Sequence, residues 1–397
     1  MTLKTMRLSV KQTVYLLKIG QMQYILAGDE NMPKKKNPIF IHSLFRSGST
    51  WLFERFRESS ASYWCYQEPY HEALIALNAN PDTLLSFSEA ITHVLRHPKM
   101  KAPYFQEFYE IKDELKGLFD KKISYDSFFD PLVCPAFEPY TKALVDNAQG
   151  RPVLQCCRSF GRVSFLKAAL SGTHILLWRD PVSQWLSYQI NDYFDNMNLS
   201  LLNAIHPPEV MQLLRYEIGF KEVRAENYQE EYSILLKFPL GSKQRYQIFF
   251  TFWLYHMIHN FPLCDMDINV DRLTKDPEYT EYKKDELNNL DIPDVNITQC
   301  MMPATVQSKT GERYFNTLEN WVVHLFRQAG YSADIIELAL QRRQEQQPKP
   351  KYDKKSLIED ASRARTMAYR YADRLSEALK ENNQLRAQVN ALEGKKI

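Results

Sequence analysis

The sequence predicts an α/β fold in which a mostly parallel sheet is flanked by helices, and three observations favour it. Short apolar runs typical of buried strands alternate with stretches that have helical spacing. Basic and hydroxyl-rich turns follow two of these runs directly, as expected where loops leave the carboxyl edge of a parallel sheet. The 397 residues are 44% hydrophobic and 13% aromatic, which is enough for one large domain or two modest ones.

Five apolar runs are predicted as strands, and the last is the weakest candidate. They are Ile39–Leu44, Tyr63–Tyr66, Val153–Cys157, His174–Trp178 and Met266–Val270. Strands that alternate with helices form a sheet whose ligands bind at the carboxyl edge. Two intervals between the strands, Ser86 to Asp146 and Asp192 to Phe261, are long insertions, and we expect them to wall a substrate pocket.

The chain divides into four parts on composition. Residues 1–37 form an N-terminal extension that ends in a basic, proline-bounded segment, and residues 38–342 hold the sheet domain. Residues 343–355 are polar, contain two prolines, and are predicted to be a linker. The extension never accumulates about 20 consecutive apolar residues, so we expect neither a signal peptide nor a transmembrane segment.

Residues 356–394 are predicted to form a coiled-coil helix. Their seam residues recur with four-three spacing: Ala361, Ala364, Ala368, Tyr371, Leu375, Ala378, Asn382, Leu385, Val389 and Leu392. Asn382 falls at an a position, where a single buried Asn fixes two-stranded register. A homodimer is therefore expected, although the small residues early in the seam leave a single helix docked on the main domain as an alternative.

Charge and cysteine usage limit the function classes. The formal net charge is only +2, from 50 basic and 48 acidic residues, so nucleic acid is not an expected partner. The six cysteines are scattered without disulfide or zinc spacing, which favours reduced thiols and a cytoplasmic location. His256 and His259 lack further ligands nearby, and His42 lies within a strand, so these histidines are expected to be structural and no metal site is predicted.

The most informative segment is the turn between the first strand and the helix that follows it. Arg46-Ser47-Gly48-Ser49-Thr50-Trp51 combines a full positive charge, hydroxyl groups and a helix start, which together suit a phosphate or sulfate group. The turn lacks the lysine and the upstream glycine of a Walker P-loop, which disfavours hydrolysis of a nucleoside triphosphate.

This turn resembles the 5′-phosphosulfate loop of the sulfotransferases that use 3′-phosphoadenosine 5′-phosphosulfate (PAPS), in the Arg-Ser-Gly form of the carbohydrate-type branch. A second segment, from His174 to Ser187, resembles the 3′-phosphate site of the same family, with Arg179 ending a strand and Pro181 opening a helix. The resemblance implies that residues 46–51, Arg179 and Ser187 bind the donor. An ion pair between Arg179 and Asp180 is the structural alternative.

A third segment bears on the chemistry. Glu68-Pro69 resembles the Glu-Pro segment in which the family places its proposed base, and His71 is the rival base. Arg158 and the segment 268–277 resemble weaker family segments. Lys309, in a basic loop after the core, occupies the region where cytosolic sulfotransferases hold the 3′-phosphate, although their Arg-Lys-Gly order is absent.

The resemblance covers roughly residues 37 to 330 and implies the sulfotransferase fold, a sheet like that of P-loop NTPases. It implies an enzyme that transfers a sulfuryl group from PAPS to a carbohydrate or glycolipid hydroxyl, requires no metal and releases adenosine 3′,5′-bisphosphate. The missing membrane anchor favours a bacterial relative. Two alternatives stay open, a kinase-like phosphotransferase that depends on magnesium and a non-catalytic coiled-coil scaffold with a relic donor site.

Overall fold

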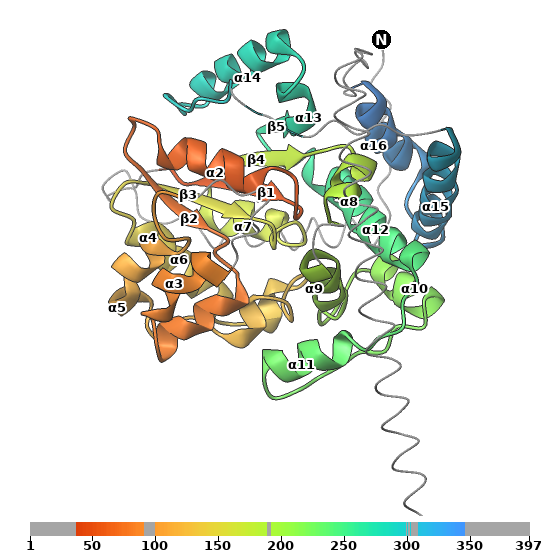
Figure 1. Ribbon diagram of the computed structural model, residues 1–397, viewed down its shortest axis with the longest axis horizontal. Helices are drawn as coiled ribbons and strands as arrows, with labels where there is room; N and C mark the ends of the chain where they lie inside the picture. The colour runs from red at the N-terminus through yellow and green to blue at the C-terminus, as the bar shows by residue number, and fades with distance from the viewer. Residues whose placement is uncertain are drawn as a thin grey trace, which may run out of the picture.

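A five-stranded parallel sheet lies at the centre of the molecule (Figure 1). The computed structural model describes residues 37–90, 100–188, 192–298, 300, 302 and 309–345. The strands are β1 (Ile39–Ser43), β2 (Tyr63–Gln67), β3 (Arg151–Cys156), β4 (Thr173–Trp178) and β5 (Met266–Asn269). Each begins and ends within two residues of its predicted bounds. The prediction of an α/β fold with a parallel sheet flanked by helices is confirmed.

The strand order, β2-β3-β1-β4-β5, creates a point at which the chain connections diverge. Ile39 of β1 pairs with Val153 of β3 on one side and with Thr173 of β4 on the other. After β1 the chain turns toward β2, whereas after β4 it continues to β5 at the opposite edge. Ligands of open parallel sheets bind outside the carboxyl ends of the strands at such a point. The loops that follow β1 and β4 meet there.

Helices cover the sheet in three groups. On one face lie α2 (Ser49–Arg57), α13 (Val270–Leu273) and α14 (Pro277–Asn289). On the other face lie the 3₁₀ helix η1 (Glu72–Asn78), α3 (Thr83–Ala90), α4 (Gln106–Glu110), α5 (Lys112–Leu115), α6 (Phe137–Asp146) and α7 (Val163–Leu170), with two short 3₁₀ helices, η2 (Lys121–Ile123) and η3 (Pro131–Val133).

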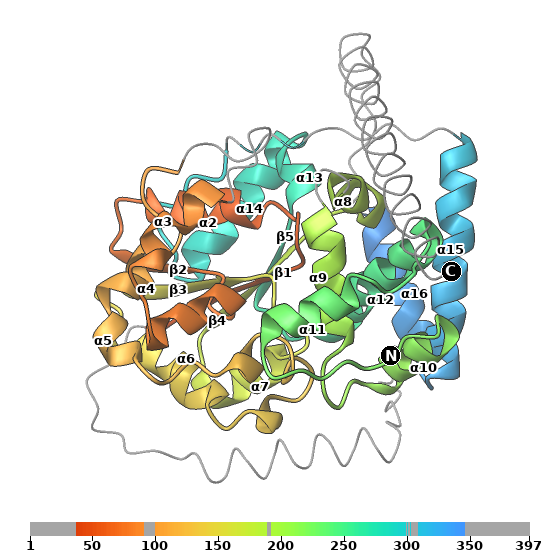
Figure 2. The same cartoon turned by 60° about the horizontal axis from the view of Figure 1, so that its bottom comes forward.

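The third group gathers beyond the carboxyl ends of the strands, on one side of the molecule in both ribbon views (Figures 1 and 2). It comprises α8 (Pro181–Tyr188), α9 (Asp192–Leu202), α10 (Glu209–Glu217), α11 (Tyr228–Leu235), α12 (Ser242–Asn260), α15 (Lys309–Gln328) and α16 (Ala333–Glu345). Its core is the aromatic helix α12, which packs against α8, α9, α15 and α16.

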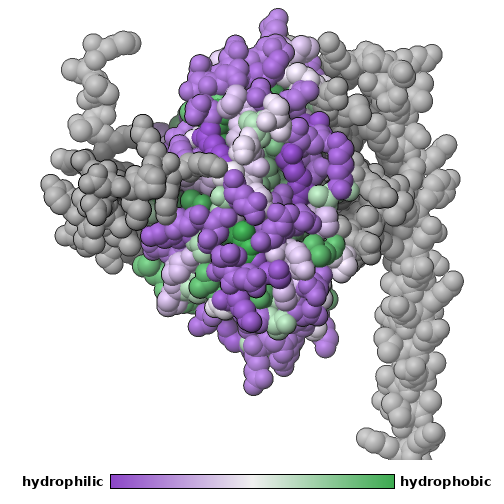
Figure 3. Space-filling view, turned by 90° about the vertical axis from the view of Figure 1, so that its left-hand side faces the viewer, coloured by the Kyte–Doolittle hydropathy of each residue, from purple (hydrophilic) through white to green (hydrophobic). Residues whose placement is uncertain are grey.

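The central strands are largely apolar because both of their faces are covered. Ile39 and Ile41 face α2 and pack with Phe53, whereas Phe40 faces the opposite side with Leu154. All of these side chains are buried. The side of the molecule that carries α4 and α5 is mainly hydrophilic, with only separate apolar spots (Figure 3). Among the described helices, none has the combination of length and hydropathy required to cross a membrane.

Some of the predicted segments lie outside the described residues, and others differ from the observed helices. The extension up to residue 36 and the predicted coiled-coil helix at 356–394 lie outside them. Helix α16 ends at Glu345, beyond the linker boundary expected after 342. The basic loop predicted around Lys309 is instead the first turn of α15, and this prediction is wrong. Gly311 disfavours a helix by about 1 kcal/mol, but the apolar face farther along α15 packs on α10 and α12 and fixes the helix.

Candidate active site

The turn that links β1 to α2 presents a row of backbone amides without partners. Arg46 and Gly48 both adopt positive φ, 65° and 87°, so the chain forms a tight concave turn. No side chain caps α2, and within the described part of the chain the amides of Ser47 through Trp51 donate to no acceptor. Successive free amides at a helix N-terminus bind anions. The anion cradle expected from the sequence stays a prediction, and the backbone of this turn has the shape that it requires.

Gly48 is required at this turn for two reasons. Its φ of 87° is a left-handed conformation that side chains rarely adopt. A Cβ atom there would lie 3.0 Å from Cε of Met302 and 3.0 Å from Cγ1 of Val270, the first residue of α13. The turn is therefore held closely against α13, and its shape depends on a residue without a side chain.

The hydroxyl groups of the turn point inward. Ser47 donates to the carbonyl oxygen of Leu44 (2.8 Å), and Oγ of Ser49 lies 3.4 Å from Sγ of Cys157. Oγ1 of Thr50 accepts a long hydrogen bond from Gln67 (3.5 Å), and Trp51 is half-buried. The Ser49 and Thr50 hydroxyl groups, which were expected to hold the donor, thus have long contacts within the protein, which leaves the amides as the principal donors of the turn.

Arg46 and Ser187 meet at the divergence point. Nε of Arg46 donates to Oγ of Ser187 at 3.1 Å, although β1 and α8 are far apart in the sequence. The guanidinium carbon of Arg46 lies 4.9 Å from the ring centroid of Phe194 on α9, a cation–π contact. These two residues, expected to contact the same donor from its two ends, are direct neighbours.

Arg179 is buried and paired, but not with the predicted alternative partner. Its Nε and Nη2 donate to Oδ1 of Asp271 (3.0 and 2.8 Å), while Nη1 points to the carbonyl oxygen of Arg46 (3.5 Å). Asp180 caps α8 and pairs with Arg343 of α16 at 2.9 Å. The structural alternative, an ion pair between Arg179 and Asp180, is therefore wrong, because Arg179 pairs with Asp271 and is fixed beside the turn.

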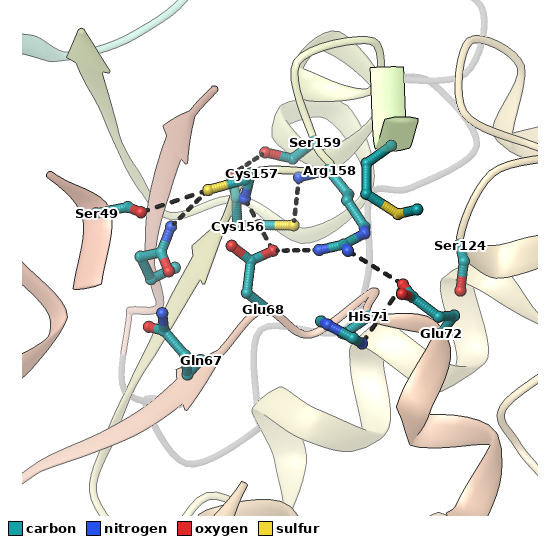
Figure 4. Close-up of polar contacts among 12 residues, drawn as sticks. Ser49, Gln67, Glu68, His71, Glu72, Ser124, Cys156, Cys157, Arg158 and Ser159 are labelled. Carbon is teal, nitrogen blue, oxygen red and sulfur yellow. Dashed lines mark hydrogen bonds and ion pairs between the residues drawn. The ribbon is translucent and has the colours of Figure 1, made fainter. Parts of the chain in front are cut away.

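Glu68 lies next to the anion-binding turn, at the end of β2 (Figure 4). Its Oε2 accepts from the backbone amide of Cys157 (3.2 Å) and from Nη1 of Arg158 (3.0 Å). The Sγ atom of the same Cys157 contacts Ser49 in the first turn of α2. Burial raises the pKa of Glu68 above the usual range of a carboxyl group, against the opposing effect of Arg158.

The two oxygens of Glu68 are held unequally. Both N–H donors, from the Cys157 amide and from Arg158, end on Oε2, while the Cys157 thiol is a further partner of the carboxylate, and the residue as a whole is only 4% exposed. A carboxylate oxygen that accepts no N–H or O–H hydrogen bond keeps its lone pairs for a proton from a bound hydroxyl group.

His71, the rival base, is held differently. Its Nδ1 accepts from the amide of Ala73 (3.1 Å) and caps η1, while Nε2 lies 3.4 Å from the hydroxyl group of Tyr193. Burial among Phe87 and Phe105 lowers the pKa of His71 to about 3. The ring is neutral and a weak base, so the geometry favours Glu68.

Three residues of this site were not identified from the sequence. Glu72 pairs with Arg158 (3.0 Å), and the hydroxyl groups of Tyr125 and Tyr193 donate to Glu72 at 2.7 and 3.1 Å. Both tyrosines come from the long insertions, so these segments do reach the site. The only sequence signal was the position of Glu72 beside His71, four residues after Glu68.

The remaining histidines have structural partners. His42 bonds with Ser159 (2.8 Å) and His174 (2.9 Å), His256 with Asn260 (2.7 Å), and His259 with the Tyr331 hydroxyl (2.7 Å). Within the described ranges, no group of three or more potential ligands is placed to hold a metal ion.

Comparisons of the chain with family models, with curated proteins and with solved structures found no match.

Proposed function

We propose that this chain is a sulfotransferase that moves a sulfuryl group from PAPS to a hydroxyl group of a carbohydrate or glycolipid. One observation carries the proposal: a turn that is lined by backbone amides and contains an arginine is joined to the carboxylate of Glu68 by a single residue. Cys157 joins the two, through its thiol to Ser49 and through its amide to Glu68. An anion site alone suits many phosphate ligands, whereas the adjacent carboxylate adds a group that removes a proton from an acceptor.

In this proposal the donor spans the divergence point between β1 and β4. The free amides of residues 47–51 and the guanidinium of Arg46 hold the 5′-phosphosulfate. Ser187, 3.1 Å from Arg46, and the Nη1 group of Arg179 hold the 3′-phosphate. Lys309, at the start of α15, stays a predicted donor contact.

The reaction is an in-line displacement at sulfur. The acceptor oxygen forms a bond to sulfur while its proton passes to Oε1 of Glu68, and the bond from sulfur to the bridging phosphate oxygen breaks. That oxygen keeps the electron pair, and adenosine 3′,5′-bisphosphate leaves. Arg46 and the amides stabilise the charge that grows on the bridging oxygen, the type of contribution that dominates many enzymatic rate enhancements.

All six cysteines are unpaired, which supports the predicted reducing, cytoplasmic setting. A homodimer through residues 356–394 remains part of the proposal. The acceptor class follows only from the carbohydrate-type resemblance of the Arg46 turn.

Calorimetric titration with adenosine 3′,5′-bisphosphate, beside adenosine 5′-phosphate and without magnesium, tests the donor site. We expect the bisphosphate to bind selectively and Ser187→Ala to weaken it about tenfold, the loss of one charge-assisted hydrogen bond. Ser183→Ala, one turn earlier on α8 and half-buried, is the matched control and should bind as the wild type does. Equal or absent binding of the two nucleotides would sink the proposal.

Turnover with labelled PAPS separates the enzyme from the two alternatives. Glu68→Gln should retain bisphosphate binding and lose about 10²–10⁴-fold in rate, the usual contribution of a general base. A strict requirement for magnesium and a nucleoside triphosphate would favour the phosphotransferase. Binding without any transfer, across a screen of sugar acceptors, would favour the scaffold.

A further inference from the structure

Two carboxylates share one buried arginine beside the proposed reaction centre. Arg158 is 1% exposed, and its Nη1 and Nη2 atoms each donate to a different glutamate, Glu68 and Glu72, at 3.0 Å. One guanidinium carries a single positive charge, so it neutralises only one of the two carboxylates fully. Their remaining contacts decide which carboxylate keeps its negative charge.

We propose that Glu72 is the permanent counter-ion of Arg158 and a positioning residue, which leaves Glu68 free to exchange a proton. The inference rests on the proposed function for its catalytic meaning, but its electrostatic part stands alone.

The hydrogen bonds around the two carboxylates are unequal. Glu72 receives three donors from three elements: Nη2 of Arg158 and the hydroxyl groups of Tyr125 and Tyr193. Glu68 receives two N–H donors, both at Oε2, from the Cys157 amide and from Arg158, and its further partner is the weakly donating Cys157 thiol. Hydrogen bonds to the charged form stabilise it, so Glu72 holds its negative charge more firmly.

The tyrosines also fix the arginine itself. Nε of Arg158 donates to the Tyr125 hydroxyl and Nη2 to the Tyr193 hydroxyl, both at 3.0 Å, and the guanidinium stacks 5.0 Å from the ring centroid of Phe45. Phe45 directly precedes Arg46 in the anion-binding turn. The shared arginine is thereby aligned with both the base and the donor turn.

The titration directions agree with this division. Burial works against the charge of Glu72, but the His71 ring, which is protonated only near pH 3 and below, together with Arg158 and the Tyr125 hydrogen bond, lowers the pKa of Glu72 to about 2. Burial raises the pKa of Glu68. Titratable and charged groups from several elements face the pair: His71 at the start of η1, Tyr104 before α4, Tyr125 after η2, Cys156 at the end of β3 with Cys157 and Arg158 after it, Tyr193 on α9 and Tyr228 on α11.

The test is the free energy of unfolding of Glu68→Gln and Glu72→Gln, each compared with the wild type by urea titration from pH 5 to pH 8. Glu68 has a raised pKa in the folded state, so its contribution is present at low pH and is lost as pH rises. Glu72 has a lowered pKa, so its contribution is present above about pH 4.5 and is lost only as pH falls. Glu110→Gln, at an exposed glutamate, measures the substitution itself.

We expect Glu68→Gln to gain stability relative to the wild type as pH rises, while Glu72→Gln is less stable than the wild type across the whole range. If Glu72→Gln does not fold, the sign of the slope for Glu68→Gln still decides. A wild type that gains stability over Glu68→Gln as pH rises would overturn the proposal, because Glu68 would then be the firmly ionised partner.

Kinetics supply the catalytic readout. In Glu72→Gln, Arg158 pairs with Glu68 alone, so the pKa of Glu68 should fall. The acid limb of the pH–rate profile should then move to lower pH by about one pH unit, and the plateau rate should fall as well. Glu72→Asp keeps the negative charge and should return the acid limb to its position in the wild type. Bisphosphate binding should be unchanged in both variants, and failure of the wild type to bind it would sink the proposed function while leaving the charge division intact.

Discussion

At the scale of single residues, Gly48 shows how closely the anion-binding turn is built against its neighbours. The turn needs a left-handed residue, and Met302 and Val270 occupy the space that a side chain would need. A mutation there acts through the backbone and through sterics together, so it changes the turn even though glycine contributes no chemical group.

Gly48→Ala should destabilise the fold by about 2–3 kcal/mol, from a left-handed penalty of about 1–2 kcal/mol plus the close contacts. Gly219→Ala is the matched control, because Gly219 also has positive φ (68°) but nothing lies near its absent side chain. Gly219→Ala should lower the free energy of unfolding by the backbone penalty alone. Urea unfolding measures both, and equal losses would show that the contacts with α13 are irrelevant.

The individual residues of the site were predicted unevenly from the sequence. Arg46 and Ser187 were expected at one donor site, and their side chains touch. The pairing of Arg158 with Glu72 was not foreseen, because the two lie 86 residues apart and the sequence carries no mark of such an ion pair. Asp271, the partner of Arg179, was not foreseen for the same reason, although it lies within the segment 268–277, which resembles a family segment.

At the scale of elements, the strands were predictable and their order was not. Every residue of β1 and of β4 is buried, and apolar side chains predominate in both, so each strand stands out in the sequence. The order β2-β3-β1-β4-β5 depends on pairings between distant segments, which local patterns do not encode. The first turn of α15 was mistaken for a loop because its glycine and charges outweighed the apolar face that follows.

Helix α16 contacts the candidate site through the side chain of Arg343, which binds Asp180. Arg343 donates to Asp180 (2.9 Å) and Glu319 (2.7 Å), and Tyr246 of α12 donates to Glu319 as well (2.6 Å). Asp180 directly follows Arg179. The last described helix thus reaches the turn that is proposed to hold the 3′-phosphate.

Arg343→Ala should destabilise the fold by about 2–4 kcal/mol, because it removes a cation that pairs with two largely buried carboxylates. Arg342→Ala is the control on the same helix. Arg342 is half-buried over the ring of Phe261, and its loss should cost about 1 kcal/mol. Thermal and urea unfolding measure both losses, and a smaller effect at 343 than at 342 would contradict the role of the ion-pair network.

At the scale of the whole molecule, buried neutral histidines make the fold sensitive to acid. Burial lowers the pKa of four of them to about 3 or about 4, and that of a fifth in the same direction: His71, His256, His174, His259 and His42. The unfolded chain takes up protons on these rings near pH 6.5, whereas the folded protein does not. Their contribution to stability is therefore complete above pH 6.5 and declines as pH falls toward 4.

Each such histidine adds a slope of up to about 1.4 kcal/mol per pH unit between pH 6 and pH 4.5. His259→Gln should remove one of these slopes, so its stability relative to the wild type should improve as the pH is lowered. His324→Gln, at an exposed position of α15, controls for the substitution. The measurement is the urea midpoint at half-unit steps of pH, and parallel curves for His259→Gln and the wild type would refute the expectation.

The central place of β1 also has a consequence for biosynthesis. β1 leaves the ribosome first among the strands, yet its two partners, β3 and β4, follow only after about 110 and about 130 further residues. At about 5–20 residues per second, the apolar segment Ile39–Ile41 waits roughly 6 to 22 seconds for β3, the first strand with which it can pair. The nascent chain therefore carries an unpaired, aggregation-prone strand through nearly a third of its translation, and this interval is when a chaperone is of most use to it.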